Sequence, residues 1–92
     1  MLLTQRPGGD YTYITTATTT QVKTGEGILK RIVINAALTG TIKIINGTAG
    51  TTANIATITN PTVGTQFEYT LDFADGLRIV TSDTCDITVV SE

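Results

Sequence analysis

The chain has 92 residues, a formal net charge of −2 and a sequence pI of about 4.8. A single domain of this size buries roughly 64% of the surface that its unfolded chain exposes, so the core is small and association with further subunits is expected. Only six residues are basic and they are scattered, which argues against nucleic-acid binding, because that activity needs clustered cations. A single cysteine cannot form a disulfide within the chain.

Threonine supplies 21 of the 92 residues, whereas charged residues make up 15% and histidine and tryptophan are absent. Threonine, valine and isoleucine branch at Cβ, which suits the pleated, half-buried surface of a sheet. The helix formers Glu, Lys, Gln and Arg are scarce. The composition therefore predicts an all-β protein.

Residues 1–10 are predicted to form an N-terminal arm ahead of the folded domain. A Pro-Gly-Gly stretch disfavours regular structure there, and only Leu2 and Leu3 offer apolar contact. With Arg6, these leucines are candidates for a segment that becomes ordered on a neighbour. The arm lacks the charged start and apolar run of a signal peptide, and no segment approaches a membrane span. We therefore expect synthesis in the cytoplasm and no membrane partner.

The first strands are predicted between residues 11 and 24, where threonines dominate and charge is low. The pattern indicates one or two strands with a break near Ala17. Because strand side chains alternate between two faces, Tyr11 and Tyr13 share a face.

Residues 27–36, G-I-L-K-R-I-V-I-N-A, form a long predicted strand. Strict alternation places Ile28, Ile32 and Ile34 on one face and Leu29 on the other.

Residues 41–45 form the next predicted strand, and the segment N-G-T-A-G-T-T-A follows at 46–53. This segment is longer than a tight hairpin turn, so we expect it to cross between sheets. In the following strand, 54–59, Ile55 and Ile58 lie three residues apart. That spacing does not fit alternation and indicates a bulge.

Residues 66–73, Q-F-E-Y-T-L-D-F, alternate between apolar and polar side chains and predict a strand with one wet face. Two further strands are predicted at 76–81 and 86–90. Seven to eight short antiparallel strands, with turn signals about every ten residues, predict a single small β-sandwich over residues 11–92. Two sheets of about four strands fit this spacing, and a jelly roll is one such arrangement.

Half of the eight acidic residues lie near the only cysteine, in the last third of the chain: Asp72, Asp75, Asp83 and Asp86. A calcium loop needs alternating oxygen ligands with a glycine hinge, and that pattern is absent. Zinc lacks its usual His and Cys ligands. Each aspartate has a structural explanation on a strand or in a turn, so we assign no metal or cofactor site.

Catalysis is not predicted. Cys85 has no His to act as its base and no second cysteine for redox chemistry. A carboxylate pair such as Asp83 with Asp86 would need desolvation or a close charge partner to tune it. The turns of a small sandwich are mostly exposed to solvent, so such a carboxylate pair would not be desolvated. We therefore interpret the chain as non-enzymatic, with no catalytic residue.

Two surface patterns suggest binding. Thr57-Ile58-Thr59 and the threonine-rich run at 15–20 are similar to the flat threonine faces of ice-binding proteins, but those faces need a regular ladder and this chain has no repeat. Tyr11 and Tyr13 suit a sugar-stacking platform, although the absence of tryptophan weakens that interpretation. A cover for the core edge or for an interface is the favoured role of the tyrosines.

Several runs in the second half of the chain carry a family resemblance. They are G-I-L-K-R-I-V-I-N-A, T-I-K-I-I-N-G-T-A-G, A-T-I-T and F-E-Y-T-L-D-F-A-D-G-L-R-I-V-T-S, with the ending D-I-T-V-V. Together they resemble small structural proteins encoded in tailed-bacteriophage genomes. The most telling part is F-A-D-G-L-R-I-V-T-S followed by D-I-T-V, and the match covers residues 25–91.

The resemblance implies a virion component with a β-sandwich or jelly-roll fold, and capsid decoration (cement) proteins are the favoured subgroup. Such proteins are made in the host cytoplasm, bind the capsid exterior and usually clamp neighbouring major capsid proteins as trimers or dimers. The expected partners are the major capsid protein and further copies of the chain. The candidate capsid or subunit contacts are Leu2, Leu3, Arg6, Tyr11 and Tyr13.

Two alternatives stand beside this hypothesis. One is a tail- or fibre-associated recognition domain that binds a host surface glycan through loops such as 46–53. The other is a bacterial sandwich module outside any virus. The number of copies per virion separates decoration from recognition, and the neighbouring genes identify the third class.

Overall fold

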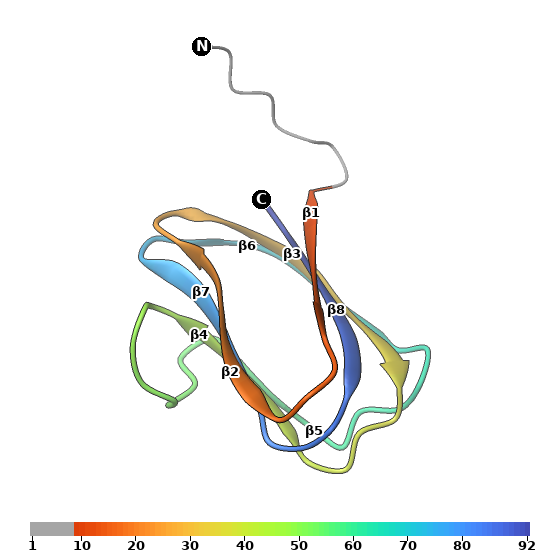
Figure 1. Ribbon diagram of the computed structural model, residues 1–92. Coiled ribbons are helices and arrows are strands. Elements are labelled where there is room, and N and C mark those ends of the chain that lie inside the picture. The colour runs from red at the N-terminus through yellow and green to blue at the C-terminus, as the bar shows by residue number, and fades with distance from the viewer. Residues whose placement is uncertain (1–8) are drawn as a thin grey trace.

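The computed structural model describes residues 9–92, which form eight β-strands and no helix (Figure 1). The predicted contact residues Leu2, Leu3 and Arg6 lie outside the described residues. Asp10, which the sequence assigns to the arm, is the first residue of β1. The strands are β1 (Asp10–Ile14), β2 (Thr18–Thr24), β3 (Gly27–Ala36), β4 (Thr41–Asn46), β5 (Ala56–Thr59), β6 (Gln66–Phe73), β7 (Gly76–Thr81) and β8 (Asp86–Ser91).

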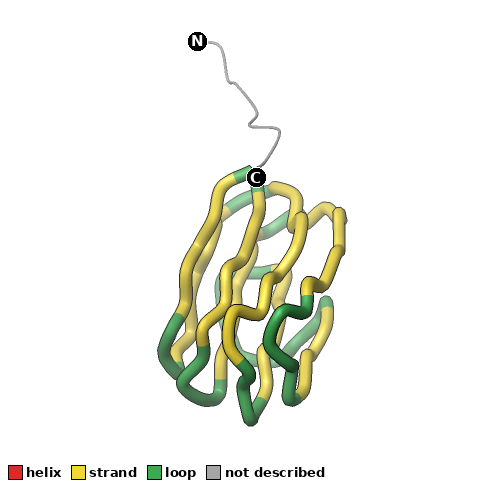
Figure 2. The backbone as a smooth tube through the Cα atoms, turned by 90° about the vertical axis from the view of Figure 1, so that its right-hand side faces the viewer, coloured by secondary structure: helices red, strands yellow, loops and turns green. Residues whose placement is uncertain are grey.

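The strands form two four-stranded antiparallel sheets, seen as two layers in Figure 2. One sheet has the order β1-β8-β3-β6 and the other the order β2-β7-β4-β5. The first strand therefore lies beside the last, and the second beside the seventh, which is the strand order of a jelly roll. The predicted all-β sandwich is confirmed.

Most connections cross from one sheet to the other, and the long segment between β4 and β5 does not. Within residues 9–92, β4 and β5 are the only consecutive strands that pair with each other. The predicted crossing by residues 46–53 is therefore wrong. Packed sheets lie about 10 Å apart, a span that two or three extended residues cover, so short links suffice for the crossings. The predicted break near Ala17 is confirmed as one such link, between β1 and β2.

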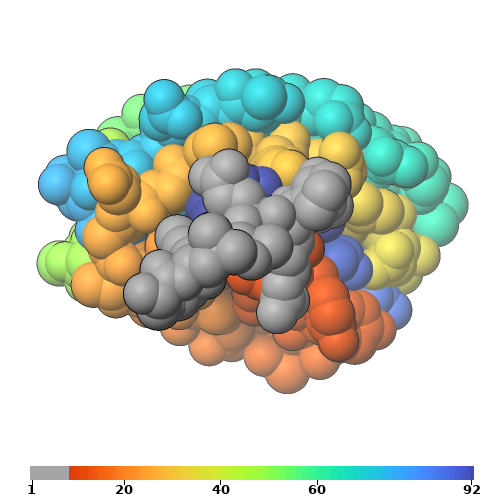
Figure 3. All heavy atoms as spheres, turned by 90° about the horizontal axis from the view of Figure 1, so that it is seen from above, coloured from red at the N-terminus to blue at the C-terminus, as the bar shows by residue number. Residues whose placement is uncertain are grey.

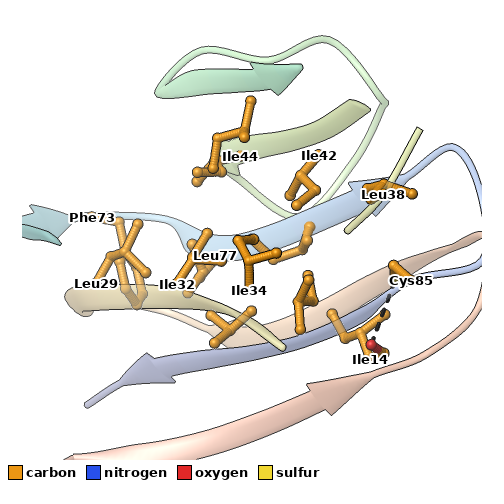
Figure 4. Close-up of a cluster of buried hydrophobic side chains, with 14 residues drawn as sticks. Ile14, Leu29, Ile32, Ile34, Leu38, Ile42, Ile44, Phe73, Leu77 and Cys85 are labelled. Atoms are coloured by element: carbon orange, nitrogen blue, oxygen red, sulfur yellow. Dashed lines mark hydrogen bonds between the residues drawn. The ribbon is translucent and has the colours of Figure 1, made fainter. Parts of the chain in front are cut away.

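The core lies between the two sheets, and side chains from β3 point toward those from β4 and β7 (Figure 4). Isoleucine dominates it because a branched side chain fits the pleated surface while filling the gap between sheets. The buried cluster consists of Ile14, Leu29, Ile32, Ile34, Leu38, Ile42, Ile44, Ile58, Phe73, Leu77, Ile79, Cys85, Ile87 and Val89.

A bulge in β3 overturns the predicted division of its faces. Leu29, Ile32 and Ile34 are all fully buried, although strict alternation places Leu29 opposite the two isoleucines. The register between β3 and β8 shifts between Leu29 and Arg31, so Lys30 is an extra residue. The extra residue reverses the alternation at that point and turns Leu29 toward the core.

The exposure of β6 alternates along its length as predicted, with Phe67, Tyr69 and Leu71 more buried than their neighbours. This strand also carries an extra residue opposite the β3 bulge, where Thr70 has a φ of 50°. The predicted bulge near Ile55 and Ile58 is wrong. Here β5 begins only at Ala56, and its register with β4 runs without a shift.

Candidate functional site

Tyr11 and Tyr13 lie on the outer face of the first sheet, with 77% and 56% of their surface exposed. Their strand, β1, is at the edge of that sheet, while the intervening Thr12 is half-buried and Ile14 joins the core. The predicted shared face is confirmed. The two tyrosines do not cover the core edge, because they point away from the core.

The register across the sheet shows which side chains surround the tyrosines. One row runs from Tyr11 through Val90 and Arg31 to Glu68, and a second from Tyr13 through Thr88 and Val33 to Gln66. We call this surface the open face. It comprises Tyr11, Tyr13, Arg31, Val33, Asn35, Gln66, Glu68, Asp86, Thr88 and Val90.

Polar side chains on the open face are bonded to one another. The Asn35 amide donates to Asp86 Oδ1 at 3.2 Å and to Thr88 Oγ1 at 3.1 Å. The Tyr13 hydroxyl hydrogen-bonds Asp86, and this bond holds the pKa of Tyr13 above its usual 10.0 because it favours the neutral phenol. Arg31 Nε donates to Glu68 at 2.9 Å. These bonds fix the side chains around the aromatic pair.

The composition of the open face suits contact with another macromolecule. Tyrosine and arginine are enriched in protein interfaces, where a large planar group supplies contact area at a low cost in side-chain entropy. The sequence identified the two tyrosines. It did not identify Asn35, Val90 or Asp86 as their neighbours, because pairing between distant strands leaves no local signal.

Loop 46–53, the predicted specificity loop of the alternative hypothesis, is held against the outer face of the second sheet. Arg78 Nε donates to the Gly50 carbonyl at 2.9 Å, and its Nη1 donates to the Thr48 carbonyl at 3.2 Å. The same nitrogen donates to Gln21 Oε1 at 2.8 Å. A guanidinium bonded to three acceptors has its donors directed at the loop and at β2, so its role is to fix the loop.

The loop also covers an outward-facing side chain, Ile45, which is only 3% exposed although it lies outside the core cluster. Ile45 is the register partner of Arg78. At the base of the loop, Asn46 and Asn54 exchange two hydrogen bonds of 2.6 and 3.0 Å. We call this surface, formed by Gln21, Ile45, Arg78 and residues 46–54, the covered face.

The four aspartates near the C-terminus do not form one site. Asp72 is exposed on the wet side of β6 and Asp75 is exposed in the β6–β7 link. Asp75 acts through its backbone: its N–H donates to Asn46 Oδ1, and its carbonyl accepts from the Gly25 N–H. Asp83 contacts Ser82, whereas Asp86 belongs to the open face. Within residues 9–92, no group of three or more His, Cys, Asp or Glu residues is placed to hold a metal ion.

Cys85 is a buried thiol at the edge of the core. Its Sγ lies 3.5 Å from the Ile14 carbonyl, drawn as a dashed line in Figure 4, and 3.8 Å from the Thr16 carbonyl. Burial raises the pKa of the thiol above its usual 9.0. A thiol that stays protonated and donates to backbone carbonyls links β8 to β1, which is a structural role.

No helix that could span a membrane occurs in the part of the chain that the structure describes. Comparison with protein-family models, with curated proteins and with solved structures gives no match.

Proposed function

We propose that the chain is a non-enzymatic bacteriophage virion protein that decorates the exterior of the capsid and stabilises the major capsid shell. The resemblance of residues 25–91 to small structural proteins of tailed phages supports the assignment. The observation that carries it further is the open face, where two exposed tyrosines lie on the edge strand that directly follows the N-terminal segment.

The mechanism of such a protein is energetic rather than chemical. A decoration protein that bridges neighbouring capsid subunits buries surface on both, and separating the subunits then requires that surface to be exposed again. A standard interface buries about 1,600 Å² in total. Its net binding energy is smaller than this area alone suggests, because ordering and desolvation oppose association. Many copies acting together would offset the internal pressure of packaged DNA.

Two parts of the chain are assigned to assembly. The first is the segment 1–8, with Leu2, Leu3 and Arg6 as its apolar and charged contacts. The second is the open face, with Tyr11 and Tyr13 as its exposed aromatics.

Binding to particles tests the proposal. Particles of the phage whose genome encodes the chain, stripped of the protein, are incubated with the purified chain and sedimented. The chain is expected to co-sediment in many copies per particle, and electron microscopy is expected to place them over the head. Deletion of residues 1–8 is expected to lower occupancy at least about tenfold, which corresponds to about 1.4 kcal/mol, with an unchanged melting temperature.

The control for that deletion is Val63→Ser, which alters an exposed apolar residue in the loop between β5 and β6. It should leave occupancy unchanged. Unchanged occupancy after the deletion would show that residues 1–8 do not contribute to capsid binding. Absence of the chain from purified virions would overturn the decoration role itself.

One observation favours the second candidate function. The tyrosine pair lies beside the Asn35 amide and the Asp86 carboxylate, and aromatic faces next to polar planar groups suit a sugar. A tail- or fibre-associated domain that binds a host surface glycan would be present in few copies at the tail. The copy number and location from the same micrographs therefore separate the two functions.

A further inference from the structure

The strands at the edges of the two sheets differ in how well they are protected against pairing with another chain. Residues 9–92 place β1 and β6 at the edges of the first sheet and β2 and β5 at those of the second. Viewed from above in Figure 3, β1 (red) and β6 (cyan) lie on opposite long sides of the molecule. An edge strand exposes unpaired backbone N–H and C=O groups, and proteins block them with bulges, charges, proline or short length.

Three of these edges carry such features. In β6, the extra residue at Thr70 interrupts the ladder, and Glu68 places a charge on the strand. In β2, the register shifts between Gln21 and Lys23, so the edge has both an irregularity and a lysine. The remaining edge, β5, has four residues, and the Asn60-Pro61 pair ends it.

β1 has none of these features within its run. It pairs with β8 over all five residues without a register shift, and its one charge, Asp10, is at its first position. Its centre is Tyr11-Thr12-Tyr13, with both tyrosines more than half exposed. Aromatic and β-branched residues are those that pair best across antiparallel strands.

The sequence of β1 is complementary to itself in the antiparallel direction. When two copies pair about a two-fold axis through Thr12, Tyr11 of one copy lies opposite Tyr13 of the other, and this occurs twice. Asp10 lies opposite Ile14, so no like charges meet. Both aromatic pairs then lie on the same face of the joined sheet, since Tyr11 and Tyr13 share a face in each copy. Cross-strand aromatic pairs of this kind stabilise sheets.

We propose that β1 is a homodimer interface, in which a second copy of this chain pairs antiparallel with β1, centred on Thr12, and joins the two sheets into one continuous eight-stranded sheet. The interface is isologous, so it closes at two copies. It adds backbone hydrogen bonds along the edge and packs the tyrosines of the two copies against each other on the outer face of the joined sheet. The paired tyrosines remain on the outer face of the joined sheet, so the open face stays available to the capsid together with residues 1–8.

The expected dimer is a weak one. A single pair of five-residue strands with its side chains belongs to the smaller class of interfaces, below about 1,200 Å² in total. Sedimentation velocity and light scattering of the full chain, from low micromolar concentrations to about 0.5 mM, should therefore show a reversible monomer–dimer equilibrium. A monomer throughout that range would overturn the proposal, and so would a trimer.

The double variant Tyr11→Lys/Tyr13→Lys tests the edge. The lysine introduced at position 11 would face the lysine introduced at position 13 of the other copy, so the dimer dissociation constant should rise at least about tenfold. Both positions are exposed, so the melting temperature of the monomer should stay near that of the parent. The matched control is Val63→Lys, which adds a lysine at another exposed apolar residue and should leave the dissociation constant unchanged.

The register is tested by Tyr11→Glu/Tyr13→Lys, which differs from the disrupting variant only at position 11. In the antiparallel register the introduced glutamate faces the introduced lysine of the other copy twice, so dimerisation should recover relative to the variant with two lysines. In both variants the lysine at position 13 keeps a favourable neighbour in Asp86. Equal dissociation constants for the two double variants would overturn this register.

This inference does not rest on the virion assignment. The purified chain dimerises or does not, whatever particle it belongs to. A dimer without capsid binding would leave the interface in place and remove the decoration role.

Discussion

The outer faces of the two sheets differ in whether the chain itself covers them. On the covered face, the outward Ile45 is buried beneath residues 46–54, and Arg78 holds the loop there through two backbone carbonyls. On the open face, Tyr11 and Tyr13 are exposed, and their polar neighbours bond to one another beside them.

The difference shows where a partner is expected. Exposed apolar area on a sheet is a cost in water, and the chain removes it on one side with its own longest inter-strand segment. On the other side it leaves an aromatic pair at a sheet edge, where another chain can cover it. We therefore interpret the covered face as a stability feature and propose the open face as the surface used in assembly.

The largest expected effect on stability comes from the apolar residues that distinguish the two faces. Ile45→Ala should lower the free energy of unfolding by about 3 kcal/mol, because it leaves a cavity beneath the loop. Tyr11→Ala should change it by less than about 0.5 kcal/mol, because the ring is exposed in the monomer. Urea unfolding at micromolar protein measures both. Equal losses of unfolding free energy in the two variants would contradict the distinction between a covered face and an open face.

A smaller effect is expected from the bonds that hold the loop. Arg78→Met keeps the aliphatic stem but removes the three hydrogen bonds, and it should cost about 2 kcal/mol. Limited proteolysis should then cut within residues 47–53 faster than in the parent. The control, Arg31→Met on the open face, removes a partly exposed pair with Glu68 and should cost less than about 1 kcal/mol. Unchanged cleavage in Arg78→Met would show that the arginine does not hold the loop.

The smallest effect is a dependence on alkaline pH. Burial raises the pKa of Cys85 and of Tyr69, so the folded chain holds these protons more tightly than the unfolded chain. Their contribution is complete below pH 9 and is lost as the pH rises through the raised values. Unfolding curves between pH 7 and pH 11, about two units either side of the thiol's usual value, should therefore show a falling midpoint.

Two variants test which side chains cause the loss of stability at alkaline pH. Cys85→Ala should flatten the first part of the decline, because it removes the buried thiol. Tyr13→Phe should remove at most a late part of the decline, since the raised pKa of Tyr13 depends on its exposed hydrogen bond to Asp86, and an absorbance titration should lose its high-pKa phenol. A decline that vanished in Tyr13→Phe would contradict the assignment to buried groups.

Much of the local structure follows from the sequence. The strand at 27–36 begins and ends where its apolar run predicts, and the alternation in 66–73 correctly marks a half-buried strand. The link between β6 and β7 also lies between the strands predicted at 66–73 and 76–81, and Gly76 begins β7 with no room for a side chain: a Cβ there would lie 2.8 Å from the Lys23 carbonyl oxygen. The strand positions depend on residues that are neighbours in the chain, whereas the close approach of Lys23 to Gly76 depends on tertiary packing.

The candidate site could be predicted only in part. Tyr11 and Tyr13 are recognisable as a shared aromatic face because alternation is a local property. Their bonded neighbours, Asn35 and Asp86, come from strands that lie far along the chain. The length of loop 46–53 predicts a crossing between sheets, because no local signal indicates that Arg78 holds the loop against its own sheet.

The sequence by itself determined an all-β chain, the approximate position of most strands and the shared face of Tyr11 and Tyr13, because side-chain branching and a two-residue period act within each strand. The tertiary structure alone decided the strand order, the bulge that turns Leu29 inward, and the covering of Ile45. Each of those depends on register with strands distant in sequence, where a shift of one residue exchanges the core face for the water face.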